Sequence, residues 1–178
     1  TAIEECKILA ERLDAPVCNG YQHNDSFPGS HPLAVGPLGY NGSKAAMQLI
    51  SKADVVLALG TRLNPFSTLP GYGIDYWPKK ATIIQVDMNP DRIGLTKKVT
   101  VGICGDCKMV AKQISDKLSK DAGNDGREER KNLIHKTKSA WLQTLTGLDH
   151  EEDDPGTVWN KEARERDKDR MSPRQAWR

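Results

Sequence analysis

The sequence lacks any apolar run near the roughly 20 residues that a bilayer crossing needs. No secretory signal is visible, and the formal net charge is only +2. Basic residues in the last third alternate with acidic ones, as in Arg127–Arg130, which is not typical of a nucleic-acid surface. We therefore expect neither a membrane nor a nucleic acid as a partner, and we expect the protein to work in the cytoplasm.

Cysteine is also scarce, with 4 residues in the chain: Cys6, Cys18, Cys104 and Cys107. A chain of 178 residues does not need disulfide staples, so we interpret these as reduced thiols. Cys104 and Cys107 have C-x-x-C spacing, but a zinc site would need a second pair of ligands. We favour a structural interpretation, in which Asp106 caps a helix and Cys107 lies in its first turn. We predict no metal site.

No Ser/His/Asp set and no paired-carboxylate spacing supports an independent hydrolase. His23 and His31 fall in a polar stretch without partners at ligand spacing. We therefore predict that this segment contains no catalytic residue.

Two short apolar runs organise the middle of the chain, Asp54–Gly60 and Ala81–Asp87. Such β-branched runs are typical of parallel strands. Ligands bind beyond the carboxyl ends of these strands, so we expect any small-molecule site near Gly60 and Asp87. Arg62 could bind a phosphate or carboxylate, or pair with an acidic neighbour. Asp87 could accept hydrogen bonds from a ribose or cap the following turn, and the sequence leaves these alternatives open.

Helical spacing of apolar residues predicts helices at Ile3–Leu13, Lys44–Lys52, Asp106–Lys117 and Arg127–Leu148. A short buried strand is expected at Pro16–Cys18. Residues 19–38 show neither helical nor strand periodicity, so a long polar loop is predicted there. Residues 64–80 are predicted to form a surface loop with a short helical turn. Its aromatic residues Tyr72, Tyr76 and Trp77 could pack on a ligand, but such residues more often pack on a neighbouring domain, which is the expectation here.

A glycine-rich turn, Gly36–Ser43, leads into the second predicted helix. Free backbone amides and the positive end of a helix dipole can receive an anion, which makes Gly36 and Gly39 candidate contacts. The spacing is G-x-x-G-x-x-G, however, and not the dinucleotide fingerprint G-x-G-x-x-G. Glycines that only permit a tight turn explain the pattern equally well.

The fold class predicted from these elements is α/β, a doubly wound, Rossmann-like parallel sheet over residues 1–118. Residues 119–170 are predicted to be a linker and charged helices. Ser172 and Pro173 have the pattern of a helix start, so residues 171–178 are expected to open a further domain. The chain begins as a helix followed by a strand, and we expect its preceding strand to lie outside the sequence.

Four segments resemble a known family: Gly36–Tyr40, Gly60–Phe66, Gly71–Pro78 and Asp87–Gly94. They are similar to the central domain of thiamine-diphosphate enzymes of the acetolactate synthase and pyruvate oxidase type. Within that group, the sequences of these four segments most resemble the sulfoacetaldehyde acetyltransferase family. Residues 171–175 resemble the opening of that family's third, diphosphate-binding domain.

The resemblance implies a three-domain subunit whose middle part is this chain. The whole enzyme is expected to convert sulfoacetaldehyde and phosphate into acetyl phosphate and sulfite. Thiamine diphosphate and Mg²⁺ are expected between the first and third domains of paired subunits, in a homodimer or homotetramer. Because the first and third domains are absent from this chain, the segment alone is expected to bind neither cofactor tightly and to be inactive.

In flavin-binding relatives, FAD lies near positions that correspond to Gly36, Gly39, Arg62 and Asp87, with Gly60 at the end of the intervening strand. The implied reaction has no redox step, so FAD or an ADP-type nucleotide is not expected, and such a site would be either vestigial or adapted to another nucleotide. Two alternatives stay open from the sequence: a free-standing nucleotide-binding module, and a segment whose only role is subunit packing.

Overall fold

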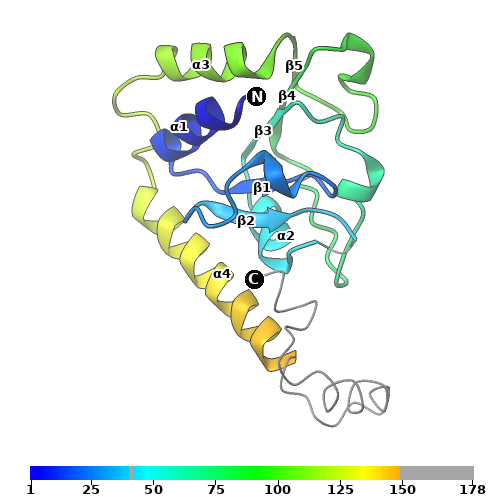
Figure 1. Cartoon of the computed structure of the whole chain (residues 1–178), viewed down its shortest axis with the longest axis vertical. Helices are drawn as coiled ribbons and strands as arrows, with labels where there is room; N and C mark the ends of the chain where they lie inside the picture. Colours follow the sequence, from blue (N-terminus) through cyan, green and yellow to red (C-terminus); the bar gives the residue numbers. More distant parts are fainter. Residues whose placement is uncertain (41, 149–178) are drawn as a thin grey trace. The chain divides into compact units, whose positions relative to one another are not determined.

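The computed structural model describes residues 1–40 and 42–148. Residues Thr1–Lys138 form one compact unit, and a second unit begins at Ser139. The fold described here is that of the first unit (Figure 1). The predictions for residues 149–170 and for a domain start at 171–178 lie outside the described residues, and the predicted domain boundaries stay predictions.

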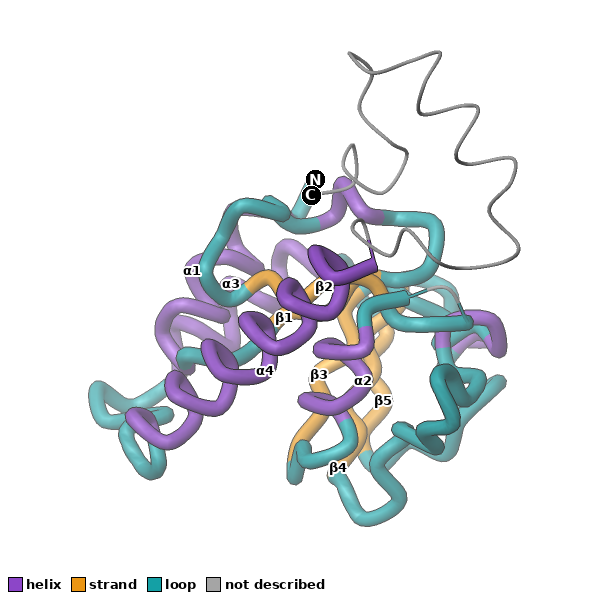
Figure 2. Tube along the Cα trace, turned by 90° about the horizontal axis from the view of Figure 1, so that it is seen from below, coloured by secondary structure: helices purple, strands orange, loops and turns teal. Residues whose placement is uncertain are grey.

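The described strands are all parallel and form two sheets (Figures 1 and 2). The first sheet pairs β1 (Val17–Asn19) with β2 (Ala34–Pro37). The second has the order β3 (Val55–Leu59), β4 (Thr82–Asp87) and β5 (Val101–Cys104). This arrangement confirms the predicted parallel α/β class. The middle strand of the second sheet is the most buried, because it has a neighbour on each edge.

One prediction about this region is wrong. Residues 19–38 are not an unbroken loop, because they contain a 3-10 turn at Asn24–Ser26 and the strand β2 at Ala34–Pro37. Four residues are too few for an alternating pattern to be visible. The strand also contains Gly36 and ends on Pro37, two residue types that signal a turn. Pro37 is tolerated because β2 lies at the edge of its sheet.

Among the described residues, the α-helices are four: α1 (Ile3–Leu13), α2 (Lys44–Ile50), α3 (Cys107–Lys117) and α4 (Arg127–Leu148). All four were predicted, and α2 ends two residues earlier than expected. Helices α1 and α3 pack side by side (Figure 1). No helix in the part of the chain that the structure describes is long and apolar enough to cross a membrane.

The main hydrophobic core includes Phe27, Met47 and Tyr76. Tyr76 is fully buried, and its hydroxyl donates a hydrogen bond to the backbone oxygen of Ser67 at 3.0 Å. The expectation that Tyr76 packs on another domain is therefore wrong. Its sequence context of prolines and glycines predicted a surface loop, but the side chain turns inward and forms part of this unit's own core.

Arginine side chains satisfy the free carbonyl groups at two helix ends. Arg12 donates to carbonyl oxygens at the end of α3, and Arg130 donates to those of Leu13 and Asp14 at the end of α1. Arg127 also pairs with the Asp14 carboxylate at 2.7 Å. Cations at helix C-termini interact favourably with the helix dipole. Within the first unit, these contacts hold the end of α3 and the start of α4 against the end of α1.

Candidate functional site

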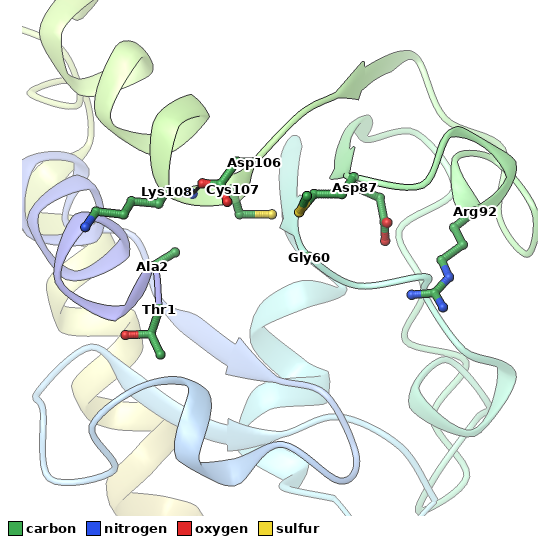
Figure 3. A pocket seen from close by; sticks show the side chains of 9 residues that line it. Thr1, Ala2, Gly60, Asp87, Arg92, Asp106, Cys107 and Lys108 are labelled. Atoms are coloured by element: carbon green, nitrogen blue, oxygen red, sulfur yellow. Dashed lines mark hydrogen bonds between the residues drawn. The ribbon is translucent and has the colours of Figure 1, made fainter.

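A cleft of about 370 Å³ lies at the carboxyl ends of β3 and β4, beside the first turn of α3 (Figure 3). It is lined by Thr1, Ala2, Gly60, Asp87, Met88, Arg92, Asp106, Cys107 and Lys108. Gly60 and Asp87 are the two strand-end residues that the sequence placed at a common edge, and the parallel register of β3 on β4 brings them together. This is the position at which open parallel sheets bind ligands.

Asp87 is the last residue of β4 and is only 6% exposed. Its Oδ1 accepts a hydrogen bond from the Asn89 amide at 2.9 Å, and its backbone oxygen accepts one from the Gly105 amide at 3.1 Å. The sequence left two roles open for this carboxylate, accepting hydrogen bonds from a ribose or capping the following turn. The bond to Asn89 is the second of these. The bond fixes the direction of the carboxylate at the edge of the cleft (Figure 3).

The thiol of Cys107 lies against the end of β3. Gly60 has φ +63°, and a Cβ atom there would lie 3.2 Å from the Cys107 Sγ. The thiol donates to the backbone oxygen of Val86 at 3.7 Å. Burial, and then the carboxylates of Asp106 and Asp87, raise the pKa of Cys107 above its ordinary value. The group is a protonated thiol at neutral pH and a poor nucleophile.

The charges that line the cleft balance one another. Asp106 is the N-cap of α3, and its Oδ1 accepts hydrogen bonds from the Lys108 amide at 2.8 Å and from the next amide at 3.1 Å. The Lys108 side chain pairs with Glu5 of α1 at 3.5 Å. The lining thus contains two carboxylates, Asp87 and Asp106, and two cations, Arg92 and Lys108. This lining has no excess of positive charge to attract a phosphate chain.

The glycine turn that precedes α2 is packed against other parts of the chain. Gly39 has φ +112°, and a Cβ atom there would collide with the backbone oxygen of Phe66. Gly36 has φ +90°, and a Cβ atom there would lie 2.8 Å from the Cβ of Ser43. Both glycines are needed for a left-handed backbone and for close approach. Neither lines the cleft.

The amide and the hydroxyl of Ser43, the last residue of this turn, are both bonded within the chain. The Ser43 amide donates to the Pro37 backbone oxygen at 2.7 Å, and the Ser43 hydroxyl accepts from the Ala46 amide at 3.2 Å. The helix that follows has only 7 residues. The tight-turn explanation of the glycines is thus sufficient for their geometry, and a contact of Gly36 or Gly39 with a nucleotide stays a proposal.

Arg62, the predicted anion ligand, is exposed and does not line the cleft. The arginine that lines it is Arg92, which the sequence argument did not select. Arg92 ends a 3-10 turn, Pro90–Arg92, directly after the strand that supplies Asp87. Arg92 could have been found from the sequence as a basic residue a few positions beyond the end of a predicted strand. Thr1 and Ala2 gave no signal, because they reach the cleft only through the packing of α1.

The model of the thiamine pyrophosphate enzyme family, central domain, matches residues 1–114. The chain belongs to this family. A solved structure of an enzyme from Mycobacterium smegmatis, assigned as thiamin diphosphate-dependent, is 26% identical with a TM-score of 0.52. It covers 67% of this chain, and the chain covers 22% of it. The predicted family and fold class are thereby confirmed.

Curated relatives of this central domain are much closer in sequence. A Rhizobium meliloti protein named "Probable sulfoacetaldehyde acetyltransferase" is 76% identical over 99% of this chain. A sulfoacetaldehyde acetyltransferase of Roseovarius nubinhibens is 73% identical over 99% of it. A Methanocaldococcus jannaschii protein named "Probable acetolactate synthase large subunit" is 37% identical over 83% of it. The chain spans 30%, 29% and 22% of the lengths of these three relatives.

Proposed function

We propose that the chain is the central domain of a thiamine-diphosphate-dependent acyltransferase that converts sulfoacetaldehyde and phosphate into acetyl phosphate and sulfite. The observation that carries the proposal is the 76% identity with the Rhizobium meliloti relative over 99% of the chain. Identity to the acetolactate synthase relative is about half as high, at 37%. The sequence motifs Gly60–Phe66 and Gly71–Pro78 support the same assignment.

The residues that the structure describes do not fit the anchor of thiamine diphosphate. Its diphosphate is held through Mg²⁺, which needs several oxygen ligands in near-octahedral geometry. In the described ranges 1–40 and 42–148, no three His, Cys, Asp or Glu side chains come together in a way that could hold a metal ion. Asp87 and Asp106 both use Oδ1 to accept backbone amides. We therefore assign no step of the reaction to the described residues of this chain.

Under this proposal, the flanking domains of a longer polypeptide hold Mg²⁺ and thiamine diphosphate, and the central domain keeps them in register. The chain spans about 30% of the acetyltransferase relatives, which leaves length for both domains. We also propose a homodimer or homotetramer that works in the cytoplasm. Free thiols at all four cysteines are compatible with a reducing compartment.

Sulfite release by the full-length protein tests the proposal. Sulfoacetaldehyde, phosphate, thiamine diphosphate and Mg²⁺ are supplied, and sulfite and acetyl phosphate are measured together. We expect the two products in equal amounts from the full-length protein. The 178-residue chain is the matched control, and we expect it to be inactive. Conversion of pyruvate to acetolactate by the full-length protein, with no sulfite release, would refute the proposed substrate.

A second candidate function is nucleotide binding of the FAD or ADP type at the cleft. The observation that favours it is the meeting of Gly60 and Asp87 at the carboxyl edge of the sheet. The balanced charge of the lining argues against it, so we expect calorimetry to show no binding of ADP at millimolar concentration. Binding that is lost in Arg92→Ala but kept in Arg62→Ala would instead establish a nucleotide site in the cleft.

A further inference from the structure

Lys138 lies on the buried side of α4. Ile134, one turn earlier, is 4% exposed and belongs to the main hydrophobic core. Residues four apart share one face of a helix, so this face also directs Lys138 toward the body of the unit. The side chain of Lys138 is half-buried. Because Lys138 is the last residue of the unit Thr1–Lys138, its contacts with earlier residues lie within that unit.

The amine of Lys138 is bonded to two backbone carbonyl groups. Its Nζ donates to the Pro32 oxygen at 2.8 Å and to the His31 oxygen at 3.4 Å. Lys108 and Lys112, in contrast, each pair with a carboxylate. Within residues 1–40 and 42–148, no carboxylate pairs with Lys138. The Lys138 site thus binds a cation without supplying an anion.

The two carbonyl acceptors suit a neutral amine as well as a cation. A lysine ammonium has three N–H donors, and deprotonation removes one of them. The oxygens of His31 and Pro32 use two donors, so the neutral amine still satisfies both. Its lone pair then takes the third direction, away from the two oxygens. Burial lowers the pKa of the Lys138 amine below its ordinary value, because desolvation disfavours the charged form.

The nearby carboxylate of Glu11 is engaged by His31 and not by Lys138. The Nε2 atom of His31 lies 3.0 Å from Oε1 of Glu11, and its Nδ1 accepts the Leu33 amide at 3.2 Å. An Nδ1 that accepts an amide carries no proton, so the ring is neutral while this bond is present. On α4 itself, His135 is exposed. These groups leave the amine with a larger neutral fraction than an ordinary lysine has at the same pH.

A desolvated amine with an available lone pair is a nucleophile toward activated acyl groups. The proposed reaction produces one such reagent, acetyl phosphate, at the enzyme itself. In the transfer, the Nζ lone pair attacks the carbonyl carbon of acetyl phosphate, and the bond from that carbon to the phosphate oxygen breaks. Phosphate leaves with the electron pair, and the nitrogen gives one proton to water. The products are an amide and phosphate, so no further reactant is needed.

We propose that Lys138 is a site of acetylation by acyl phosphates, and that acetylation releases the segment His31–Ala34 from α4. Acetyl-lysine keeps one N–H, so it can bond only one of the two carbonyl oxygens. The segment leads directly into β2, and the Ala34 amide donates to the His31 oxygen at 2.9 Å. The inference rests on the proposed function only for the source of acetyl phosphate, and the chemistry of the site does not depend on it.

Acetyl phosphate supplied to the 178-residue chain tests the site. The chain is incubated with millimolar acetyl phosphate, and acetylation of each lysine is followed at early times by peptide mass spectrometry. Lys136 is the matched control, because it is exposed and lies on the same helix. We expect Lys138 to react at least about threefold faster than Lys136, since the rate follows the neutral fraction of the amine. Lys112 should be the slowest of the three, because a hydrogen bond to Asp116 and the charge of that carboxylate raise the pKa of Lys112.

The same measurement on the chain unfolded in urea separates the effect of the fold from that of the local sequence. Unfolding removes both carbonyl contacts, so the rates at Lys138 and Lys136 should become equal. If Lys138 reacts no faster than Lys136 in the folded chain, the site is overturned. A preference of the same size in urea also overturns it, since the preference would then come from neighbouring residues in the sequence. Acetyl phosphate is supplied directly, so the proposed reaction can fail independently of these readouts.

Hydrogen exchange tests the release of the segment. Lys138→Gln has a neutral amide, as acetyl-lysine does, whereas Lys138→Arg keeps a cation with several N–H donors. The amides of Leu33 and Ala34 are both bonded to His31 and report on the segment. We expect them to exchange about threefold faster or more in Lys138→Gln than in Lys138→Arg. Equal exchange in the two variants overturns the release.

The Gly60 amide, which is bonded to β4 at 2.9 Å, reports whether each variant remains folded. If a variant loses protection of this amide, Leu33 and Ala34 are compared instead in the unmodified chain before and after acetylation. Faster exchange of these two amides in the acetylated chain supports the release, and unchanged exchange overturns it.

Discussion

The glycine turn Gly36–Ser43, which begins within β2, and the bend at Gly60, directly after β3, differ in what surrounds their glycines. In both, glycine adopts a left-handed backbone. At Gly39, a Cβ atom would meet the backbone of Phe66. At Gly60, it would meet the end of the Cys107 side chain. Backbone atoms cannot rotate away, whereas a thiol can. The first bend is therefore a packing element, and the second borders an open cleft.

The largest expected effect is at Gly39. Gly39→Ala should lower the free energy of unfolding by about 3 kcal/mol, because it combines strain at positive φ with a clash against fixed backbone. Gly73→Ala is the matched control: Gly73 has φ +70°, and nothing lies within 4 Å of its Cβ position. That variant should lose only about 1 kcal/mol, from backbone strain. Urea unfolding of the two variants gives both values.

Equal losses in these two variants would contradict the packing role of the glycine turn. A loss at Gly39 as small as that at Gly73 would mean that the Phe66 segment moves away freely, and the turn would then have room for a ligand.

A smaller effect is expected at Gly60. Gly60→Ala should cost about 1–2 kcal/mol, because it adds backbone strain and pushes on the Cys107 thiol at 3.2 Å. In a Cys107→Ala background the steric part should disappear, so the cost should fall toward that of backbone strain alone, about 1 kcal/mol. A double-mutant cycle by urea unfolding measures this coupling. Additive losses in the cycle would show that the thiol does not fill the space beside Gly60.

The difference between long periodic elements and short strands explains how much of the fold the sequence could predict. Helical spacing placed α1 and α4 at their observed bounds, because the period of 3.6 residues is visible over eleven or more positions. The apolar runs located β3 and β4. The strand β2 was missed, because it is four residues long and contains glycine and proline. Short edge strands are set by their pairing partner rather than by their own pattern.

The cleft was predicted in part for an analogous reason. Gly60 and Asp87 follow directly from the rule that parallel strands end at one edge. Arg62 was selected for its place in the chain, but its exposed side chain lies outside the cleft lining, and Arg92 takes that position. The contribution of Thr1 and Ala2 depends on how α1 packs, which no local pattern encodes.

The helix that follows the glycine turn and the helix whose first turn lies beside Gly60 are both capped by a side chain, α2 by Ser43 and α3 by Asp106. Asp106→Ala should lower the free energy of unfolding by about 1 kcal/mol, and Asp106→Ser should restore most of it, because a hydroxyl can accept the same amides. Asp116→Ala, at an exposed position of α3 paired with Lys112, should change stability by less than about 0.5 kcal/mol. A loss in Asp106→Ala no larger than in Asp116→Ala, measured by urea unfolding, would contradict the cap.

The smallest expected effect concerns the reactivity of the Cys107 thiol, which lies at the cleft and not at the glycine turn. Burial is the first cause that raises the pKa of Cys107, followed by Asp106 and then Asp87. Removing one carboxylate charge should therefore lower this pKa only in part. We expect alkylation of Cys107 by iodoacetamide, followed by peptide mass spectrometry at pH 8.5, to be faster in Asp106→Asn than in Asp87→Asn. Each gain should be less than about tenfold.

Asparagine keeps an oxygen that can accept the backbone amides bonded by Asp87 and Asp106, so both variants should remain folded. Asp116→Asn is the control and should leave the rate unchanged. The raised pKa also fixes the sign of a pH effect: the stability it contributes is fully present below the pKa of the unfolded thiol and is lost as pH rises through that of the folded thiol. Cys107→Ala should remove that loss at alkaline pH. If neither Asn variant alkylates faster than the unmodified chain, the two carboxylates do not act on the thiol, and burial alone sets its reactivity.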